Sequence, residues 1–354
     1  MIQTLSSQTT SSNYNVTRIY ELDIAKVVGM FFVVLGHTYS NSGADLSLRA
    51  WIYSFHMPLF FLISGILHKE KKSVSITLRY YFKTLLVPVI VFGLLYFLLY
   101  VPFSYYGLCI YNNDMSEIPI SNQQSLYSYV LAFLNYVLLG IFTGTSLPDL
   151  VLWFLVVLFL CKVWILAFNR YRTLTVFVYI CLCVVFFGFR CNYLFLKQSC
   201  IALPFYLIGY QCKNWILHVI RRYNSYGLLA ISLALNLVLT TFNGTSSMLY
   251  CVFSPNSYPI ILSSAIYYIN AFIGIFFVLS ASTKLMKFKS WFSKISKSLI
   301  AIVVFQEFFL SFYITYVGLD QPLIITVSSS VLIVFLCLSL NSFALKYCKW
   351  TLGK

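Results

Sequence analysis

Charged residues are scarce in this chain, and acidic residues are the scarcest. Of its 354 residues 9% are charged, with 9 Asp and Glu against 24 Lys and Arg. Soluble globular domains carry about a quarter charged residues, so the composition excludes that class. Hydrophobic residues instead make up 60% of the chain, and apolar runs recur from end to end. We therefore predict an all-α polytopic membrane protein.

Two further signals are absent. The ten cysteines show no paired spacing and no accompanying His, so we predict neither a disulfide framework nor a metal site, and no bound cofactor. Residues 1–17 are polar and lack the basic segment and the short apolar segment of a cleavable signal peptide. We expect 1–17 to be a disordered cytoplasmic tail and 18–354 to form a single membrane-embedded domain.

Apolar runs at ten places are long enough to span a membrane, and one more, at 126–142, is ambiguous. Cytoplasmic loops concentrate Lys and Arg. Both termini are therefore placed inside, because most basic residues then lie in cytoplasmic segments. The predicted spans are 23–39, 51–68, 80–102, 148–168, 173–189, 199–217, 225–242, 260–282, 298–317 and 321–343. The basic residues elsewhere are Arg49, Arg190 and Lys197 outside, and Lys26 and Lys162 within spans.

A span at 126–142 would put the basic clusters on opposite sides, so we predict an interfacial or re-entrant helix there. The surrounding outer loop, 103–147, contains Asp114 and Glu117 and no Lys or Arg. The net charge of +15 thus marks topology rather than a nucleic-acid partner.

The first span carries three ionisable groups in "DIAKVVGMFFVVLGH", residues 23–37. Lys26 and His37 are eleven residues apart, so both lie on one helix face, about 16 Å apart along the axis. Asp23 is three residues before Lys26 and can pair with it. Interfacial anchoring also explains Asp23 and Lys26. It explains His37 less well, because ionisable groups inside spans tend to face a functional cavity.

The second span adds "SFHMPLFFLISGILH", residues 54–68. Running inward, it brings His56 near the depth of His37. Pro58 removes a helix hydrogen bond and should bend the helix there. Ser64 and Gly65 favour close approach of another helix. A neutral imidazole suits removal of a proton from a hydroxyl at neutral pH.

The loop after this span, "HKEKKSVSITLRYYFK", is basic. Arg79 and Lys83 are candidates for holding a phosphate-bearing donor, although positive-inside bias also accounts for basic residues here. Glu307 lies mid-span, where it either pairs with Lys162 or lines the cavity. Trp153 is a further candidate for the cavity.

These motifs resemble the membrane-bound acyltransferase-3 family, and "FHMPLFF.ISG" is most similar to its fucose 4-O-acetylase-like branch. Further matches are "LRYYFKTLLVP", "LPDLVLWFLVVLF" and "ALPFYLIGYQCK", and the resemblance covers about 18–345. It implies ten spans, acetyl-CoA as donor and a sugar hydroxyl as acceptor. Lys26 and His37 match the family's essential pair, and His56 its "HMP" position. The family's penultimate-helix His is replaced here by Gln306 and Glu307.

We therefore predict an inner-membrane O-acetyltransferase that modifies a bacterial surface polysaccharide or its lipid-linked precursor. His37 is the expected base, His56 completes the cavity, and Lys26 with Asp23 orients the donor. Acetyl reaches the outer His residues either on the donor itself or as an acyl-His intermediate. Rival classes are a polysaccharide transporter or flippase, which would spread its cavity charges over many helices, and a glycan polymerase, which would carry Arg in a large outer loop.

Overall fold

The computed structural model describes residues 18–39, 43–71, 73–105, 150–188, 193–244, 248, 259–319 and 321–352. Within these ranges the chain forms helices and no strand. The helix predicted at 126–142, residues 106–147 of the outer loop around it and Arg190 lie outside the described residues.

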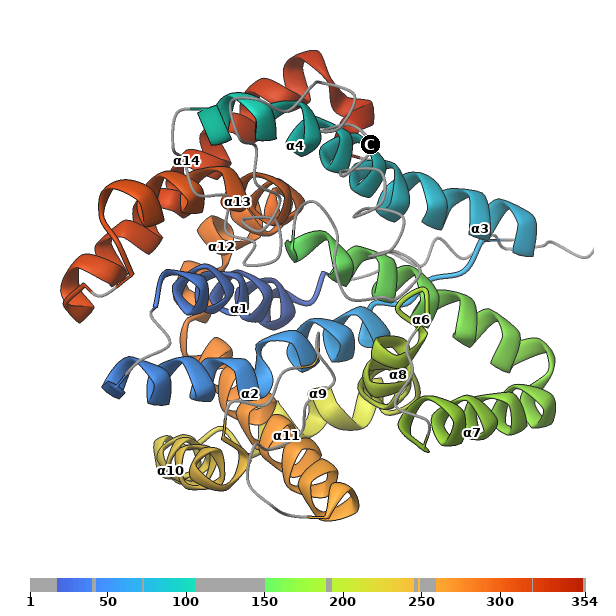
Figure 1. Cartoon of the computed structure of the whole chain (residues 1–354). Coiled ribbons are helices and arrows are strands. Elements are labelled where there is room, and N and C mark those ends of the chain that lie inside the picture. Colours follow the sequence, from blue (N-terminus) through green and yellow to red (C-terminus); the bar gives the residue numbers. More distant parts are fainter. Residues whose placement is uncertain are drawn as a thin grey trace, which may run out of the picture.

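The helices follow one another as a bundle (Figure 1). Their bounds are α1 Tyr20–Thr38, α2 Gly43–Ile66, α3 Val74–Tyr81, η1 Phe82–Leu86, α4 Val87–Tyr105, η2 Leu150–Leu152, α6 Trp153–Arg170, α7 Arg172–Gly188, α8 Leu196–Gln211, α9 Lys213–Arg222, α10 Tyr226–Asn243, α11 Ile260–Lys284, η3 Met286–Phe288, α12 Lys289–Ser296, α13 Leu299–Tyr316, α14 Leu323–Tyr347 and η4 Lys349–Leu352. Each predicted span overlaps at least one of these helices. The span predicted at 199–217 is wrong in its length, because the helix ends at Gln211 and a separate basic helix begins at Lys213.

Six helical segments of the described residues are long and apolar enough to cross a membrane. They are Val74–Tyr96, Trp153–Arg170, Tyr226–Asn243, Ile261–Lys284, Leu299–Tyr316 and Leu323–Tyr347. Among the other predicted spans, α7 and α8 have 17 and 16 residues, below the length of about 20 residues that a straight crossing needs. Ten crossings and the side on which each terminus lies stay predictions.

Helix α1 occupies the middle of the bundle, between α13 and α14 on one side and α2 and α11 on the other (Figure 1). It contacts all four of these helices and α12. Leu22, Ile24, Ala25 and Val34 on α1 are fully buried. The helix that carries the predicted catalytic pair is thus packed against five other helices.

Helices α2 and α8 approach each other closely through two glycines. A Cβ on Gly65 would overlap the carbonyl oxygen of Tyr206, and one on Gly209 would overlap the carbonyl oxygen of Leu62. Gly65 was predicted to permit close helix packing, and this is confirmed. Small residues at such crossings let backbones touch where burial of apolar surface gives little driving force in lipid.

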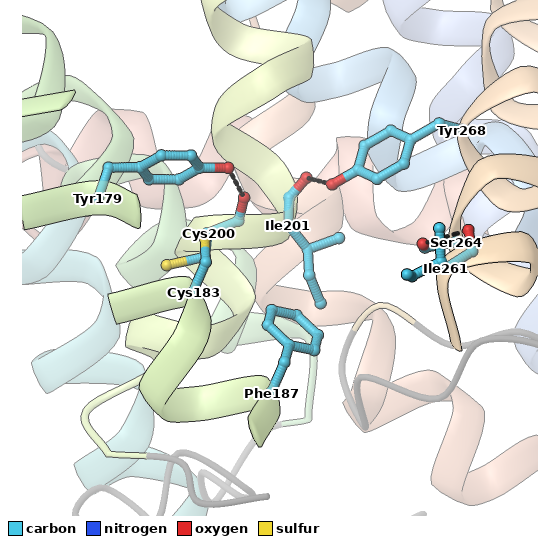
Figure 2. A pocket seen from close by; sticks show the side chains of 8 residues that line it. All are labelled: Tyr179, Cys183, Phe187, Cys200, Ile201, Ile261, Ser264 and Tyr268. Carbon is cyan, nitrogen blue, oxygen red and sulfur yellow. Dashed lines mark hydrogen bonds between the residues drawn. The ribbon is translucent and has the colours of Figure 1, made fainter. Parts of the chain in front are cut away.

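Two tyrosines hold α8 from opposite sides (Figure 2). Pro204 has no N–H, so the carbonyl oxygen of Cys200, four residues earlier, loses its usual helix partner. The Tyr179 hydroxyl donates to that oxygen at 2.9 Å. Tyr268 donates to the next carbonyl oxygen, that of Ile201, at 3.0 Å. Hydrogen bonds from α7 and α11 thus support the helix where proline weakens it.

Replacing Gly65 by Ala should destabilise the protein, because the added methyl group forces α2 and α8 apart. We expect a loss of about 1–3 kcal/mol, as for overpacked cores, seen as a lower midpoint of thermal unfolding in detergent. Gly93→Ala is the matched control, since a Cβ there meets nothing within 4 Å. Equal midpoints for the two variants would contradict the close-contact interpretation.

Candidate functional site

The beginning of α1 carries a compact charge cluster around Asp23. The Lys26 ammonium lies 2.9 Å from Asp23 Oδ1, as predicted. Two groups that the sequence did not indicate join it: Arg18 pairs with Asp23 Oδ2, and the Ser296 hydroxyl donates to Asp23 Oδ1 at 2.8 Å. Because Ser296 ends α12, the carboxylate ties α1 to a helix more than 250 positions later in the chain.

Other basic segments meet at the same end of α1. Glu21 pairs with Arg221 of α9 at 2.8 Å, and Arg18 donates to the carbonyl oxygen of Ser293 at 2.9 Å. The Lys284 ammonium, at the end of α11, donates to the carbonyl oxygen of Asn224 at 2.7 Å. We call this part of the molecule the basic end.

A cavity of about 510 Å³ opens at the basic end. Lys83, on the π-helical turn η1, lines this cavity together with Ser296 and Lys297, at the end of α12. Turns of π-helix are frequent at functional sites. Since Ser296 also binds Asp23, the cavity wall is one hydrogen bond away from the Asp23–Lys26 pair. The other residues that line the cavity are Tyr80, Thr84, Leu299, Ile300 and Leu352.

The far end of α1 brings the two predicted histidines together around a tyrosine. The Tyr53 hydroxyl lies 3.4 Å from His37 Nδ1, and the Tyr53 ring centroid lies 4.9 Å from that of His56. His56 is buried, and its Nδ1 lies 2.9 Å from the carbonyl oxygen of Ile52, four residues earlier. His37 and His56 therefore share one depth, as their positions on consecutive antiparallel helices predict.

Arg49 completes this group. Its Nη2 lies 3.3 Å from the Tyr53 hydroxyl, and its guanidinium carbon lies 5.0 Å from the ring centroid. By its place in the sequence Arg49 is only an outside basic residue, and nothing distinguishes Tyr53 from the other tyrosines. A signal was present nonetheless: Arg49, Tyr53 and His56 stand at positions i, i+4 and i+7, which share a helix face.

In the part of the chain that the structure describes, Lys162 contacts tyrosines rather than Glu307, the first alternative that the sequence left open. Its ammonium donates to the Tyr206 hydroxyl at 3.3 Å and lies 4.7 Å from the Tyr81 ring centroid. The same hydroxyl lies 2.7 Å from His68 Nδ1. This cluster joins the C-terminal ends of α2 and α3 to residues within α6 and α8. A lysine within α6 is thus accommodated by aromatic faces and a hydroxyl rather than by a carboxylate.

The other candidates are dispersed. Arg79 is exposed on α3 and is not among the described residues that line the Lys83 cavity. Trp153 begins α6 in the hydrophobic core. Gln306 and Glu307 are buried on α13.

Helix α13 has an inserted side chain near Gln306 and Glu307. The Tyr96 hydroxyl accepts from the N–H of Phe308 at 2.9 Å and donates to the carbonyl oxygen of Val304 at 3.1 Å. In a regular helix these two backbone groups bond to each other, and an insertion of this kind bends a helix. Tyr96 therefore bridges one backbone donor and one backbone acceptor of α13 at the turn that carries Gln306 and Glu307.

The described residues contain no cluster of three or more His, Cys, Asp or Glu side chains able to hold a metal ion. Another cavity, of about 240 Å³, lies between α7, α8 and α11, with Tyr179 and Tyr268 on its walls (Figure 2). Its lining is mostly apolar, and it is separate from both ends of α1.

One comparison with known proteins identifies a relationship. The family model described as an acyltransferase domain, of the acyltransferase-3 family, matches residues 19–342. No curated protein matches the chain, and no solved structure matches it.

Asp23→Asn should lower stability, because it removes the negative charge that Arg18 and Lys26 share. We expect a loss of about 1–3 kcal/mol, measured as the thermal midpoint of purified protein. Glu21→Gln is the control: it makes the same change on the same helix, but its partner Arg221 has a side chain 53% exposed to solvent. That loss should stay below about 1 kcal/mol. A larger effect at Glu21 than at Asp23 would refute the ranking.

Proposed function

The chain belongs to the acyltransferase-3 family and is a multi-pass membrane protein, and from this premise we propose that it is an O-acetyltransferase of the bacterial inner membrane. Acetyl-CoA is the donor. The acceptor is a sugar hydroxyl of a surface polysaccharide, such as O-antigen, capsule or exopolysaccharide, or of its lipid-linked precursor. One observation carries the proposal: α1 begins in a basic cluster beside a cavity and ends at a pair of histidines.

The donor site is the cavity that Lys83 and Lys297 line at the basic end. Its volume of about 510 Å³ lies within the range typical of small-molecule sites. Lys83 and Lys297 provide positive charge for the phosphates of CoA, a role for which lysine acts as a point charge. Positive-inside bias supports a cytoplasmic position for this end, where CoA is available. Lys26, held by Asp23, then lies on the path from the cavity into the bundle.

The acceptor reacts at the histidine end. His37 removes the proton from the sugar hydroxyl, whose oxygen attacks the thioester carbonyl carbon. The tetrahedral intermediate collapses with cleavage of the carbon–sulfur bond, and the CoA thiolate takes up from the imidazolium the proton that left the sugar hydroxyl. His56 lies beside Tyr53, which also contacts His37, and completes the polar wall of the site.

Acetyl has to cross most of the bundle, because the basic end and the histidine end lie at opposite ends of α1. Two routes fit this separation. The pantetheine arm extends inward from the Lys83 cavity, or His37 accepts acetyl first and the sugar hydroxyl attacks the acyl-His. In the second route the imidazole is the nucleophile and the thiolate the first leaving group, so a burst of CoA would precede sugar product.

A strain that lacks this protein should lose O-acetyl groups from its surface glycan, while glycan chain length and export stay unchanged. Wild type and His218→Ala should restore the acetyl signal in NMR spectra of the polysaccharide, and His37→Ala at matched protein level should not. His218 is a suitable control because it is exposed on α9 at the basic end. Defective export or altered chain length would instead favour the flippase or polymerase classes.

Lys83→Ala and Lys297→Ala should each raise the KM for acetyl-CoA on the order of three- to ten-fold, with little change in the KM for the sugar acceptor. The physical reason is loss of one charge contact with the donor phosphates, so high salt should raise the wild-type KM as well. Lys287→Ala is the control, since Lys287 is exposed on η3 and lies over the Phe288 ring. Unchanged donor KM in both cavity variants would remove the cavity from the donor site.

A further inference from the structure

The contact between Tyr53 and His37 joins a catalytic candidate to a residue that no part of the proposed mechanism uses. The Tyr53 hydroxyl is 3.4 Å from His37 Nδ1, and the two ring centroids are 6.1 Å apart. A methyl group on Gly36 would lie 2.9 Å from the Tyr53 ring, so the helices α1 and α2 touch at this point. Tyr53 is therefore confined beside His37 by backbone packing.

Arg49 determines what the Tyr53 oxygen can do. A guanidinium has donors and no acceptor, so in the contact of 3.3 Å the Tyr53 oxygen accepts from Arg49. The guanidinium also covers the ring face at 5.0 Å from the centroid. This cation–π contact and the hydrogen bond act on one side chain together and restrict rotation of the phenol.

The remaining contact bears on the tautomer of His37. A neutral imidazole that removes a proton through Nε2 must carry its own proton on Nδ1. The Tyr53 oxygen has a second lone pair with which to accept that Nδ1–H. A hydrogen bond on the far nitrogen is how many general bases are held in one tautomer and one orientation.

We infer that Tyr53, held in place by Arg49, is a positioning residue that orients His37 and directs proton transfer to Nε2. This inference rests on the proposed function and adds two residues to it. Arg49 acts through Tyr53, so the two form one unit. The contact of Tyr53 with His56 extends the unit across the second histidine, which keeps both imidazoles at one depth.

The test is a double-mutant cycle on the full chain in membranes, with acetyl-CoA and an acceptor glycan. Tyr53→Phe keeps the ring and removes the hydroxyl; it should lower kcat about ten-fold and change either KM by less than about two-fold. Arg49→Gln should lower kcat as well, and Tyr53→Phe should cause no further loss in the Arg49→Gln background. Arg49→Lys keeps the charge and a donor and should retain part of the activity.

Tyr268→Phe is the matched control, because it removes a tyrosine hydroxyl that binds the backbone of another helix. It should keep the wild-type kcat, and thermal midpoints of all variants should be compared to identify misfolding. Wild-type kcat for Tyr53→Phe, or independent losses that multiply in the double variant, would overturn the inference. A fully active His37→Ala variant would instead overturn the catalytic part of the proposed function, whatever Tyr53 does.

Discussion

The Asp23 carboxylate is the contact on which the rest of the site depends. It accepts from Lys26 on its own helix and from Ser296 on α12, and it pairs with Arg18. A carboxylate near the end of an apolar helix is costly unless its oxygens are bonded and its charge is balanced. The hydrogen bond from Ser296 that helps to satisfy the carboxylate also ties α1 to α12. A helix is rigid, so fixing its beginning also fixes where its last turn, with His37, arrives.

The two ends of α1 differ in the charged groups that surround them. At the basic end, cations from α1, α9, α11 and α12 gather beside a cavity, which suits an anionic ligand. At the other end, His37 and His56 lie beside a tyrosine and one arginine, with no carboxylate among the groups that contact Tyr53 in the described residues. In the proposed reaction, the donor and the sugar acceptor can thus bind at opposite ends of one helix without competing for the same charges.

Sequence reasoning succeeded where a pattern is local. The pairing of Asp23 with Lys26 and the shared depth of His37 and His56 follow from helix geometry and from the order of two short spans. It failed for Lys162, whose partners come from α3 and α8, and it missed Tyr53 because tyrosine is abundant in this chain. The contact of Arg49 with Tyr53 was missed, because a count of basic residues on each side of the membrane uses Arg49 only to assign the side of its loop.

Sequence patterns alone predict the helical class, the positions of most helices, the small residue at the α2–α8 contact and the candidate residues on α1 and α2. Those properties depend on apolar length, residue size and the 3.6-residue period, which are all local along the chain. The packing of the helices adds that Ser296 completes the Asp23 cluster, that Lys83 and Lys297 share a cavity and that Tyr53 lies between the histidines. Such contacts depend on how distant helices cross, and no local period encodes the angle or depth of a crossing.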